Sequence, residues 1–383
     1  MIHNPFKIFA FTLIAFGIAV PFFFAAYRGL FSPAAPAPTA GSNRTLLRSQ
    51  DGGLTWQRAG LSEEQSVAFP RRISDIAFDP QNPNRIFLGS RGAGLWKSDT
   101  AGVSWKKVRD SAGALRDNAD VFAIAPSPAE PGRMYLAAFQ DSFGKIFESS
   151  DEGTTFREIF SLTEERFGIF DVWAHPTDAN QILAITGQGG VFASNNGGRS
   201  WRIFEWLGQE LEELAVNPAR ISEMFIRTRR GELFRSADGG ENWRDVTAAI
   251  ANSEQRALNA SFGPSLRTLF SRSSGSVASF FFDSSVPGRL WAIRSGRLVM
   301  SSDGGSAWRE VAVPIDPGAD PLSAASVDPA KPERIIAAQG SILYRSEDNG
   351  ATWKTSLLGS SERVSKIVPH PSLPDVFFAV TGK

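Results

Sequence analysis

Short apolar runs recur along most of the chain, and polar residues, Gly or Pro close each of them. Examples are ISDIAF (73–78), ILAIT (182–186) and VFFAVTG (376–382), which combine β-branched and aromatic residues. Runs of this length and composition, bounded by turn residues, are typical of β-strands and are too short for most helices. The pattern predicts an all-β fold from residue 44 to residue 383.

A polar octapeptide follows the apolar runs seven times. Each copy has Ser at its first position, Gly at its fifth and Trp or Phe at its eighth, and the copies are 49–56, 98–105, 149–156, 194–201, 236–243, 301–308 and 346–353. Ser and Asp side chains can bond to nearby backbone groups in a tight turn, and Gly accepts a positive φ. The aromatic residue then begins the next strand. The residues expected to build these turns are Ser49, Asp51, Gly53, Trp56, Ser149, Asp151, Gly153, Phe156, Ser236, Asp238, Gly240, Trp243, Ser301, Asp303, Gly305, Trp308, Ser346, Asp348, Gly350 and Trp353.

The turns are spaced like the blades of a β-propeller. Each complete unit reads as strand, Pro-containing turn, strand, short loop, strand, polar turn and strand, a length typical of a four-stranded blade. The chain begins its first unit at the third strand (45–59) and ends with two strands that have no successor (364–383). We therefore predict a seven-bladed β-propeller closed by pairing of the N- and C-terminal strands, which leaves no open edge strand.

These turns resemble the Asp-box, or BNR, repeat. That repeat occurs in sialidases, xyloglucanase-type glycosidases, sortilin-type receptors and photosystem II assembly-factor propellers. Thr100 and Asn196 depart from the pattern at its Asp position. The resemblance implies that the box is a structural turn, on the face opposite the usual active site. Sortilin-type receptors fit less well, because they have a larger propeller followed by a Cys-rich module.

The catalytic residues that the resemblance would imply are missing from the sequence. A sialidase-type site needs a Tyr nucleophile paired with a Glu, but Tyr27 closes an apolar segment, and Tyr135 and Tyr344 lie within predicted strands. The resemblance to xyloglucanase-type enzymes implies a catalytic Asp between the second and third strands of the first blade. That loop is GSRGAG (89–94), with Arg91 and no acid. We expect no catalytic residues, although a glycan-binding protein or a glycoside hydrolase stays open as the alternative.

Composition excludes several other kinds of site. The chain has 40 basic and 40 acidic residues, which gives no net charge to attract nucleic acid. It has no Cys, and its three His are far apart in sequence, so we expect neither a metal site nor a cofactor.

The N-terminus predicts a membrane anchor. Residues 8–27 carry no charge, and about 20 apolar residues are enough to cross a bilayer. They follow a short tail (1–7), and a Pro/Ala-rich linker (28–43) leads to the propeller at 44–383. A cleaved signal peptide is the rival interpretation. With the anchor, the propeller is expected on the extracytoplasmic side, periplasmic or extracellular.

Arginines mark the expected binding face. In a propeller, the loops between strands 2 and 3 and between blades share one face, opposite the polar turns. These loops, together with a long insertion (247–276), carry the candidate ligand-binding residues Arg91, Arg229, Arg230, Arg294, Arg297, Arg256, Arg267 and Arg272. Arg suits carboxylate or phosphate groups, so an acidic peptide, glycan or lipid headgroup is the expected ligand. Scattered surface arginines without a shared role are the alternative interpretation.

Three acids occupy equivalent positions in the first strands of their blades, namely Asp75, Asp171 and Glu213. Innermost strands surround the centre of a propeller, so these acids are expected near the channel mouth. They would form either a polar ligand or cation site, or a set of solvated residues and partners of local Arg. Taken together, the sequence predicts a membrane-anchored, non-catalytic propeller that binds a protein or peptide and acts as an assembly, stability or scaffolding factor.

Overall fold

The computed structural model describes residues 46–64, 66–247, 276–316, 318, 320–358 and 362–382. The predicted anchor and linker lie outside these residues, as do Arg256, Arg267 and Arg272 of the insertion. Within the described segments, no helix has both the length and the apolar character needed to span a membrane.

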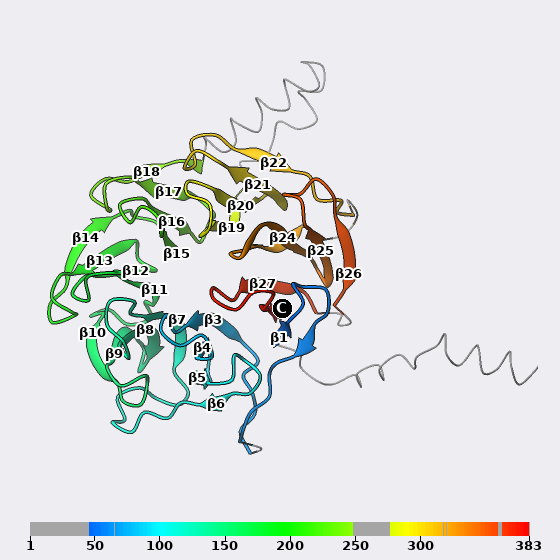
Figure 1. The fold of residues 1–383 in the computed structure, drawn as a ribbon. Helices are drawn as coiled ribbons and strands as arrows, with labels where there is room; N and C mark the ends of the chain where they lie inside the picture. The colour runs from blue at the N-terminus through cyan, green and yellow to red at the C-terminus, as the bar shows by residue number, and fades with distance from the viewer. Residues whose placement is uncertain are drawn as a thin grey trace, which may run out of the picture. The chain divides into compact units, whose positions relative to one another are not determined.

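In the described part of the chain, the strands form seven antiparallel sheets of four strands each, arranged around a common centre (Figure 1). The innermost strands are β3 (Ile73–Phe78), β7 (Asp120–Pro126), β11 (Ile169–Ala174), β15 (Leu211–Val216), β19 (Val277–Phe282), β23 (Leu322–Asp328) and β27 (Val364–Pro369). The second strands are β4 (Ile86–Ser90), β8 (Met134–Gln140), β12 (Ile182–Thr186), β16 (Met224–Thr228), β20 (Leu290–Arg294), β24 (Lys331–Gln339) and β28 (Phe377–Thr381). The predicted seven-bladed propeller is confirmed.

The outer half of each blade is also regular. The third strands are β1 (Leu46–Ser49), β5 (Gly94–Ser98), β9 (Phe143–Ser149), β13 (Gly190–Ser194), β17 (Leu233–Ser236), β21 (Arg297–Ser301) and β25 (Ile342–Ser346). The fourth strands are β2 (Gln57–Arg58), β6 (Lys106–Lys107), β10 (Arg157–Ser161), β14 (Arg202–Trp206), β18 (Arg244–Asp245), β22 (Arg309–Val311) and β26 (Lys354–Leu357).

One blade is assembled from both ends of the chain, as the sequence predicts. Its strand order is β2-β1-β28-β27, and β1 pairs antiparallel with β28, with Leu46 opposite Val380 and Ser49 opposite Phe377. The ring is therefore closed by backbone hydrogen bonds between segments more than 300 residues apart.

The hydrophobic core lies between adjacent blades. Second strands such as β4, β12 and β28 are buried along their whole length, because each of their two faces packs against a blade. Around β4, the core includes Trp96 and Trp105, each with no exposed surface. Burial of such large rings between repeats is the main source of propeller stability.

The seven polar turns join third to fourth strands and lie on one face of the ring, which we call the turn face. In a representative turn, the Ser301 hydroxyl donates to Asp303 Oδ1 (2.8 Å) and accepts from the Gly305 amide (2.8 Å). Asp303 accepts in turn from the amides of Ser306 and Ala307. In the turn at 194–201, Asn196 stands in the place of the Asp, and its Oδ1 likewise accepts from the Ser200 amide (2.9 Å). The turns are therefore locally satisfied structural units.

On the opposite face, which we call the cavity face, every innermost strand has a register shift near its start. At each shift one residue is left without a partner on the second strand, as in a β-bulge. These bulge residues are Ser74, Phe122, Phe170, Glu212, Ala278, Ser323 and Ser365. The bulge is thus a repeated feature, although its residues differ from blade to blade.

Candidate functional site

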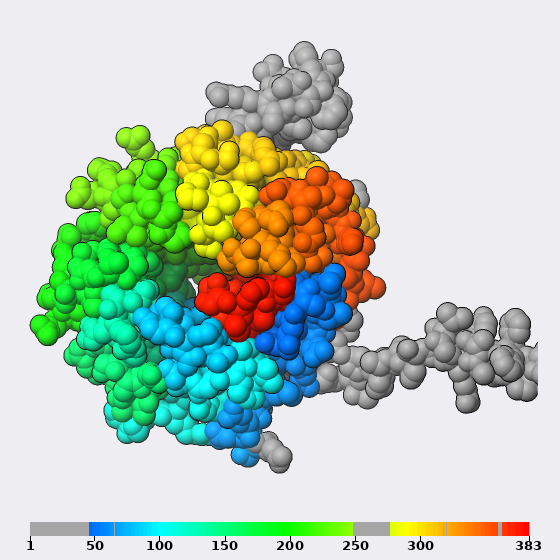
Figure 2. All heavy atoms as spheres, viewed as in Figure 1, coloured from blue at the N-terminus to red at the C-terminus, as the bar shows by residue number. Residues whose placement is uncertain are grey.

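A cavity of about 1000 Å³ opens on the cavity face, and the ring is hollowed at its centre (Figure 2). Its walls come from four sources: the loops between blades, the starts of innermost strands, the loops between second and third strands, and the end of β28. Five of the seven bulge residues line it, namely Ser74, Phe122, Phe170, Glu212 and Ser365. The repeated bulges therefore help to build the cavity.

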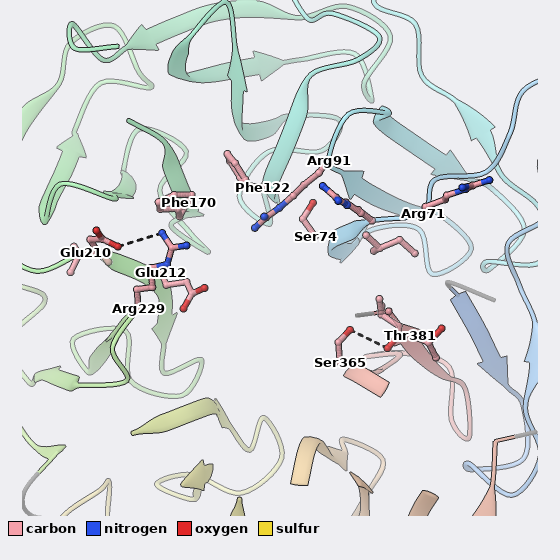
Figure 3. A pocket seen from close by; sticks show the side chains of 15 residues that line it. Arg71, Ser74, Arg91, Phe122, Phe170, Glu210, Glu212, Arg229, Ser365 and Thr381 are labelled. Carbon is pink, nitrogen blue, oxygen red and sulfur yellow. Dashed lines mark hydrogen bonds and ion pairs between the residues drawn. The ribbon is translucent and has the colours of Figure 1, made fainter. Parts of the chain in front are cut away.

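Four arginines line the cavity, and three of them form no salt bridge within the part of the chain that the structure describes. Arg229 lies 3.4 Å from Glu210. Arg91 lies over the Phe122 ring, with its guanidinium carbon 5.2 Å from the ring centroid (Figure 3). Arg71 and Arg72 are exposed, and neither they nor Arg91 forms an ion pair with any described residue. Three guanidinium groups are therefore available to an anionic ligand.

Two carboxylates lie on the wall across from Arg91. Glu210 pairs with Arg229, and Glu212 pairs with Arg227 at 2.8 Å. Glu210 immediately precedes β15 and Glu212 lies within it, so they occupy one wall and do not face each other across the cavity (Figure 3). Glycosidases place two carboxyl groups on either side of the scissile bond, and this pair does not have that arrangement.

The structure brings only some of the sequence-predicted arginines to the cavity. Arg91 and Arg229 line it, whereas Arg230 is exposed but is not part of its lining. Arg294 is 4% exposed, and Arg297 pairs with Glu310 at 2.9 Å. These two are not part of the cavity lining either.

Sequence reasoning missed Arg71 and Arg72. They immediately precede β3 in the loop between blades, which the propeller topology assigns to the cavity face. Their place in that loop could have identified them, since loops between blades lie on the same face as the loop that carries Arg91.

The three predicted acids of the innermost strands are engaged in local contacts. Lys366 Nζ lies 3.0 Å from Asp75 Oδ1, and Arg227 Nε lies 3.0 Å from Glu213 Oε2. Asp75 also accepts the backbone amide of Ile124 in the next blade. Glu213 is thus the partner of a local Arg, one of the alternatives left open by the sequence, whereas the partner of Asp75 is a lysine 291 positions away.

Asp171 plays a similar part between the next pair of blades. Its Oδ2 accepts the Leu214 amide at 2.9 Å, as Asp75 accepts the Ile124 amide. Burial, together with the negative charges of Asp75 and Glu213, raises the pKa of Asp171 to about 8 against the effect of the Leu214 amide. Among the described residues, no group of His, Cys, Asp or Glu side chains could hold a metal ion. The contacts identify Asp75 and Asp171 as ties between neighbouring innermost strands, whereas Glu213 pairs with Arg227 within its own blade.

Comparison with known sequences finds similarity to xyloglucanases over part of the chain. The chain is 26% identical to xyloglucanase Xgh74A of Acetivibrio thermocellus over 187 residues, which cover 42% of this chain and 22% of that enzyme. It is 26% identical to a xyloglucanase of a Paenibacillus species over 183 residues, or 44% of this chain and 17% of the enzyme. The chain thus matches about a fifth of the length of these relatives. No family model matches the chain.

Solved structures share the fold over most of the propeller. The GH74 xyloglucanase of Xanthomonas campestris has a TM-score of 0.60 at 16% identity, covering 81% of this chain and 50% of the enzyme. YCF48 bound to D1 peptide has a TM-score of 0.59 at 15% identity, covering 82% of this chain and 94% of YCF48. The chain is therefore a seven-bladed β-propeller similar in fold to both a glycan-cleaving enzyme and a peptide-binding protein.

Proposed function

We propose that this propeller is a non-catalytic binding module whose cavity binds an acidic segment of a partner protein. The observation that carries the proposal is the group formed by Arg71, Arg72 and Arg91, which line the cavity and form no ion pair with a described residue. An arginine without a partner can bind a carboxylate through two parallel hydrogen bonds, with no competing ion pair to break.

Two further observations support this function. The cavity is large enough for several residues of an extended peptide, since ligand sites commonly measure about 300–1,000 Å³. In addition, YCF48 holds a peptide on a propeller of the same fold. The proposal includes the assignment of the seven turns as Asp-box repeats and a role in assembly or scaffolding. Membrane anchoring by residues 8–27 and an extracytoplasmic location stay predictions from the sequence.

The test compares two proteins with the same change in net charge. In the first, Arg71, Arg72 and Arg91 are all replaced by Glu; in the second, the exposed residues Arg58, Arg199 and Arg244, which lie outside the cavity, are replaced by Glu. Binding of a fluorescent Glu-rich peptide is measured at several salt concentrations. The first variant should lose binding by about 10-fold or more, while the second keeps most of it. Equal losses would show that net charge, and not the cavity, binds the peptide.

Glycan binding or cleavage is the second candidate, and the sequence similarity to xyloglucanases favours it. In this case Glu210 and Glu212 would contact sugar in the cavity. The wild-type chain is incubated with xyloglucan, and released reducing ends are measured beside a Glu210→Gln/Glu212→Gln variant. If the wild type releases reducing ends and the variant does not, the protein is a glycosidase, and this function replaces the binding proposal. We expect no release from either protein.

A further inference from the structure

The bulge residues differ in size between two sides of the ring of innermost strands. On three consecutive blades they are large, namely Phe122, Phe170 and Glu212. On the remaining four blades they are small: Ala278, Ser323, Ser365 and Ser74. A bulge turns its side chain away from the regular alternation of the strand. Phe122 and Phe170 therefore form what we call the aromatic wall on one side of the ring. The small bulge residues on the other blades leave more open space.

The aromatic wall is not part of the propeller core. Phe122 and Phe170 come from adjacent innermost strands, and their rings pack edge to face with centroids 5.0 Å apart. Neither ring belongs to the hydrophobic clusters between blades, and both are partly exposed within the cavity lining. Large aromatic side chains held at a cavity, outside the core, are typical of ligand contacts.

Two glycines fit closely around Phe170. A Cβ atom on Gly187 would come within 2.6 Å of Phe170 Cε2, and one on Gly168 would come within 3.1 Å of the same ring. Gly187 follows β12 and Gly168 precedes β11, so both flank the ring on the cavity face. The ring therefore occupies a position that larger residues at these two sites would disturb.

The serine bulge residues already use their hydroxyl groups. Ser74 donates to the Val121 carbonyl, Ser323 to the Ala338 carbonyl at 3.2 Å, and Ser365 to the Val380 carbonyl at 3.2 Å. The hydroxyl protons are therefore not free to bind a ligand. Within the described lining, charge recognition is left mainly to the arginines, and apolar recognition to the two phenylalanines.

We infer that the cavity is selective for a peptide in which an acidic residue stands two positions from an aromatic or large aliphatic residue. Arg91 packs on Phe122, so the charged and apolar contacts are continuous. Side chains of an extended peptide alternate between its two faces, and those two positions apart lie on the same face about 7 Å from each other, which lets one reach Arg91 while the other packs against Phe122 and Phe170. This inference rests on the proposed function and adds the bulge residues as its selectivity positions.

The experiment uses two fluorescent peptides of equal length and charge. Both contain Glu in a Gly/Ser background; one places Phe two positions from each Glu, and the other places Ser there. Affinity is measured for the wild-type chain, for Phe122→Ala/Phe170→Ala, for Gly187→Ala and for a Trp206→Ala control. Trp206 is 51% exposed and lies on β14, outside the cavity lining.

The wild type and the Trp206→Ala control should bind the Phe peptide about 10-fold more tightly than the Ser peptide. The double variant should bind the two peptides equally, and Gly187→Ala should reduce the preference by displacing the Phe170 ring. Should the double variant unfold, the Gly187→Ala result decides the question, because Gly187 does not have a positive φ and tolerates Ala in its backbone.

The failures of the two proposals are distinguishable. Equal binding of both peptides by the wild type, lost in the Arg71/Arg72/Arg91→Glu variant, overturns the selectivity but keeps the acidic-peptide function. Binding of neither peptide overturns both. Wild-type binding of neutral xyloglucan oligosaccharides but of neither peptide, lost in Phe122→Ala/Phe170→Ala, would assign the aromatic wall to sugar. That result would also overturn the inference.

Discussion

The turn face and the cavity face use similar polar residues in opposite ways. On the turn face, each Ser hydroxyl and Asp carboxylate bonds to groups two to four residues away, as Ser346 does with Asp348 and Gly350. On the cavity face, the side chains of Arg71, Arg72 and Arg91 form no ion pair with any described residue. The polar groups of the turn face therefore stabilise the fold. The charged groups of the cavity face, which differ between blades, can bind a ligand.

A further contrast concerns ring closure, which also depends on the turn face. Arg334 on β24 pairs with buried Asp328 at 2.9 Å and with Asp375 in the turn between β27 and β28. Arg345 donates to the Gly52 carbonyl of the first polar turn at 2.7 Å, and the Gly52 amide donates to the Asp375 carbonyl. This network ties the blade β23–β26 to both halves of the closing blade.

The largest expected effect is therefore on this network. Arg334→Ala would leave the Asp328 carboxylate, whose side chain is 3% exposed, without its buried partner. Breaking a buried ion pair from one side costs about 3–5 kcal/mol, and the free energy of unfolding in denaturant should fall by that amount. The control is Arg309→Ala, an exposed arginine on β22. A loss below about 1 kcal/mol would show that the network does not stabilise the closed ring.

The next effect concerns a single polar turn. Ser301 is 1% exposed, and Ser301→Ala would leave the Gly305 amide without its acceptor. An unsatisfied buried backbone group costs about 1–3 kcal/mol, measured as the loss in unfolding free energy. The neighbouring exposed residue Ser302 provides the control Ser302→Ala, expected within about 0.5 kcal/mol of wild type. Similar results for both variants would contradict the structural role of the hydroxyl.

Acid provides a test of the Asp positions in these turns. Hydrogen bonds from the Thr352 side chain, the Thr352 amide and the Ser346 hydroxyl lower the pKa of Asp348 to about 2. This folded-state pKa lies below the unfolded value near 4. The stability contributed by the ionised Asp348 carboxylate is therefore present above pH 4 and is lost as pH falls toward 2.

In Asp348→Asn, the acceptor for the Thr352 amide can remain, as Asn196 shows in its own turn, but the titration is removed. Unfolding temperatures measured from pH 6 to pH 2 should differ most from wild type above pH 4 and should converge near pH 2. A difference that stays constant over this range would refute the assigned ionisation.

The smallest expected effect is on the cavity face. Replacing Arg71, Arg72 and Arg91 by Glu should change the free energy of unfolding by only about 0.5 kcal/mol, because these exposed side chains form no ion pair with a described residue. Thermal unfolding, measured on the same samples as peptide binding, checks this expectation. A large loss of stability would mean that the cavity face, too, uses its charges for folding.

The propeller fold could be predicted because the turn residues that specify it lie close together in sequence and recur in every repeat. Ser49, Asp51, Gly53 and Trp56 stand in the same order as Ser346, Asp348, Gly350 and Trp353, and each set forms one turn within eight residues. The closing blade followed from the same repeat, since β28 and β1 complete one unit. Arg91 and Arg229 were placed correctly because loop position in a propeller decides which face a residue occupies.

The cavity was less predictable, because its residues meet only across blades. Ser74, Phe122 and Phe170 are about 48 residues apart in sequence, and each lies within a run that reads as an ordinary apolar or mixed strand. A bulge shifts the register by one residue, and the sequence carries no mark of that shift. Likewise, the pairing of Lys366 with Asp75 joins residues 291 positions apart.

The sequence by itself determined the class of fold, the number of blades and the way the ring closes, because each rests on short-range turn chemistry repeated seven times. Only the tertiary structure decided which side chains face the cavity, which arginines have ion-pair partners and where two phenylalanines form a wall. Those features depend on distances between blades, and closure of the ring sets these distances.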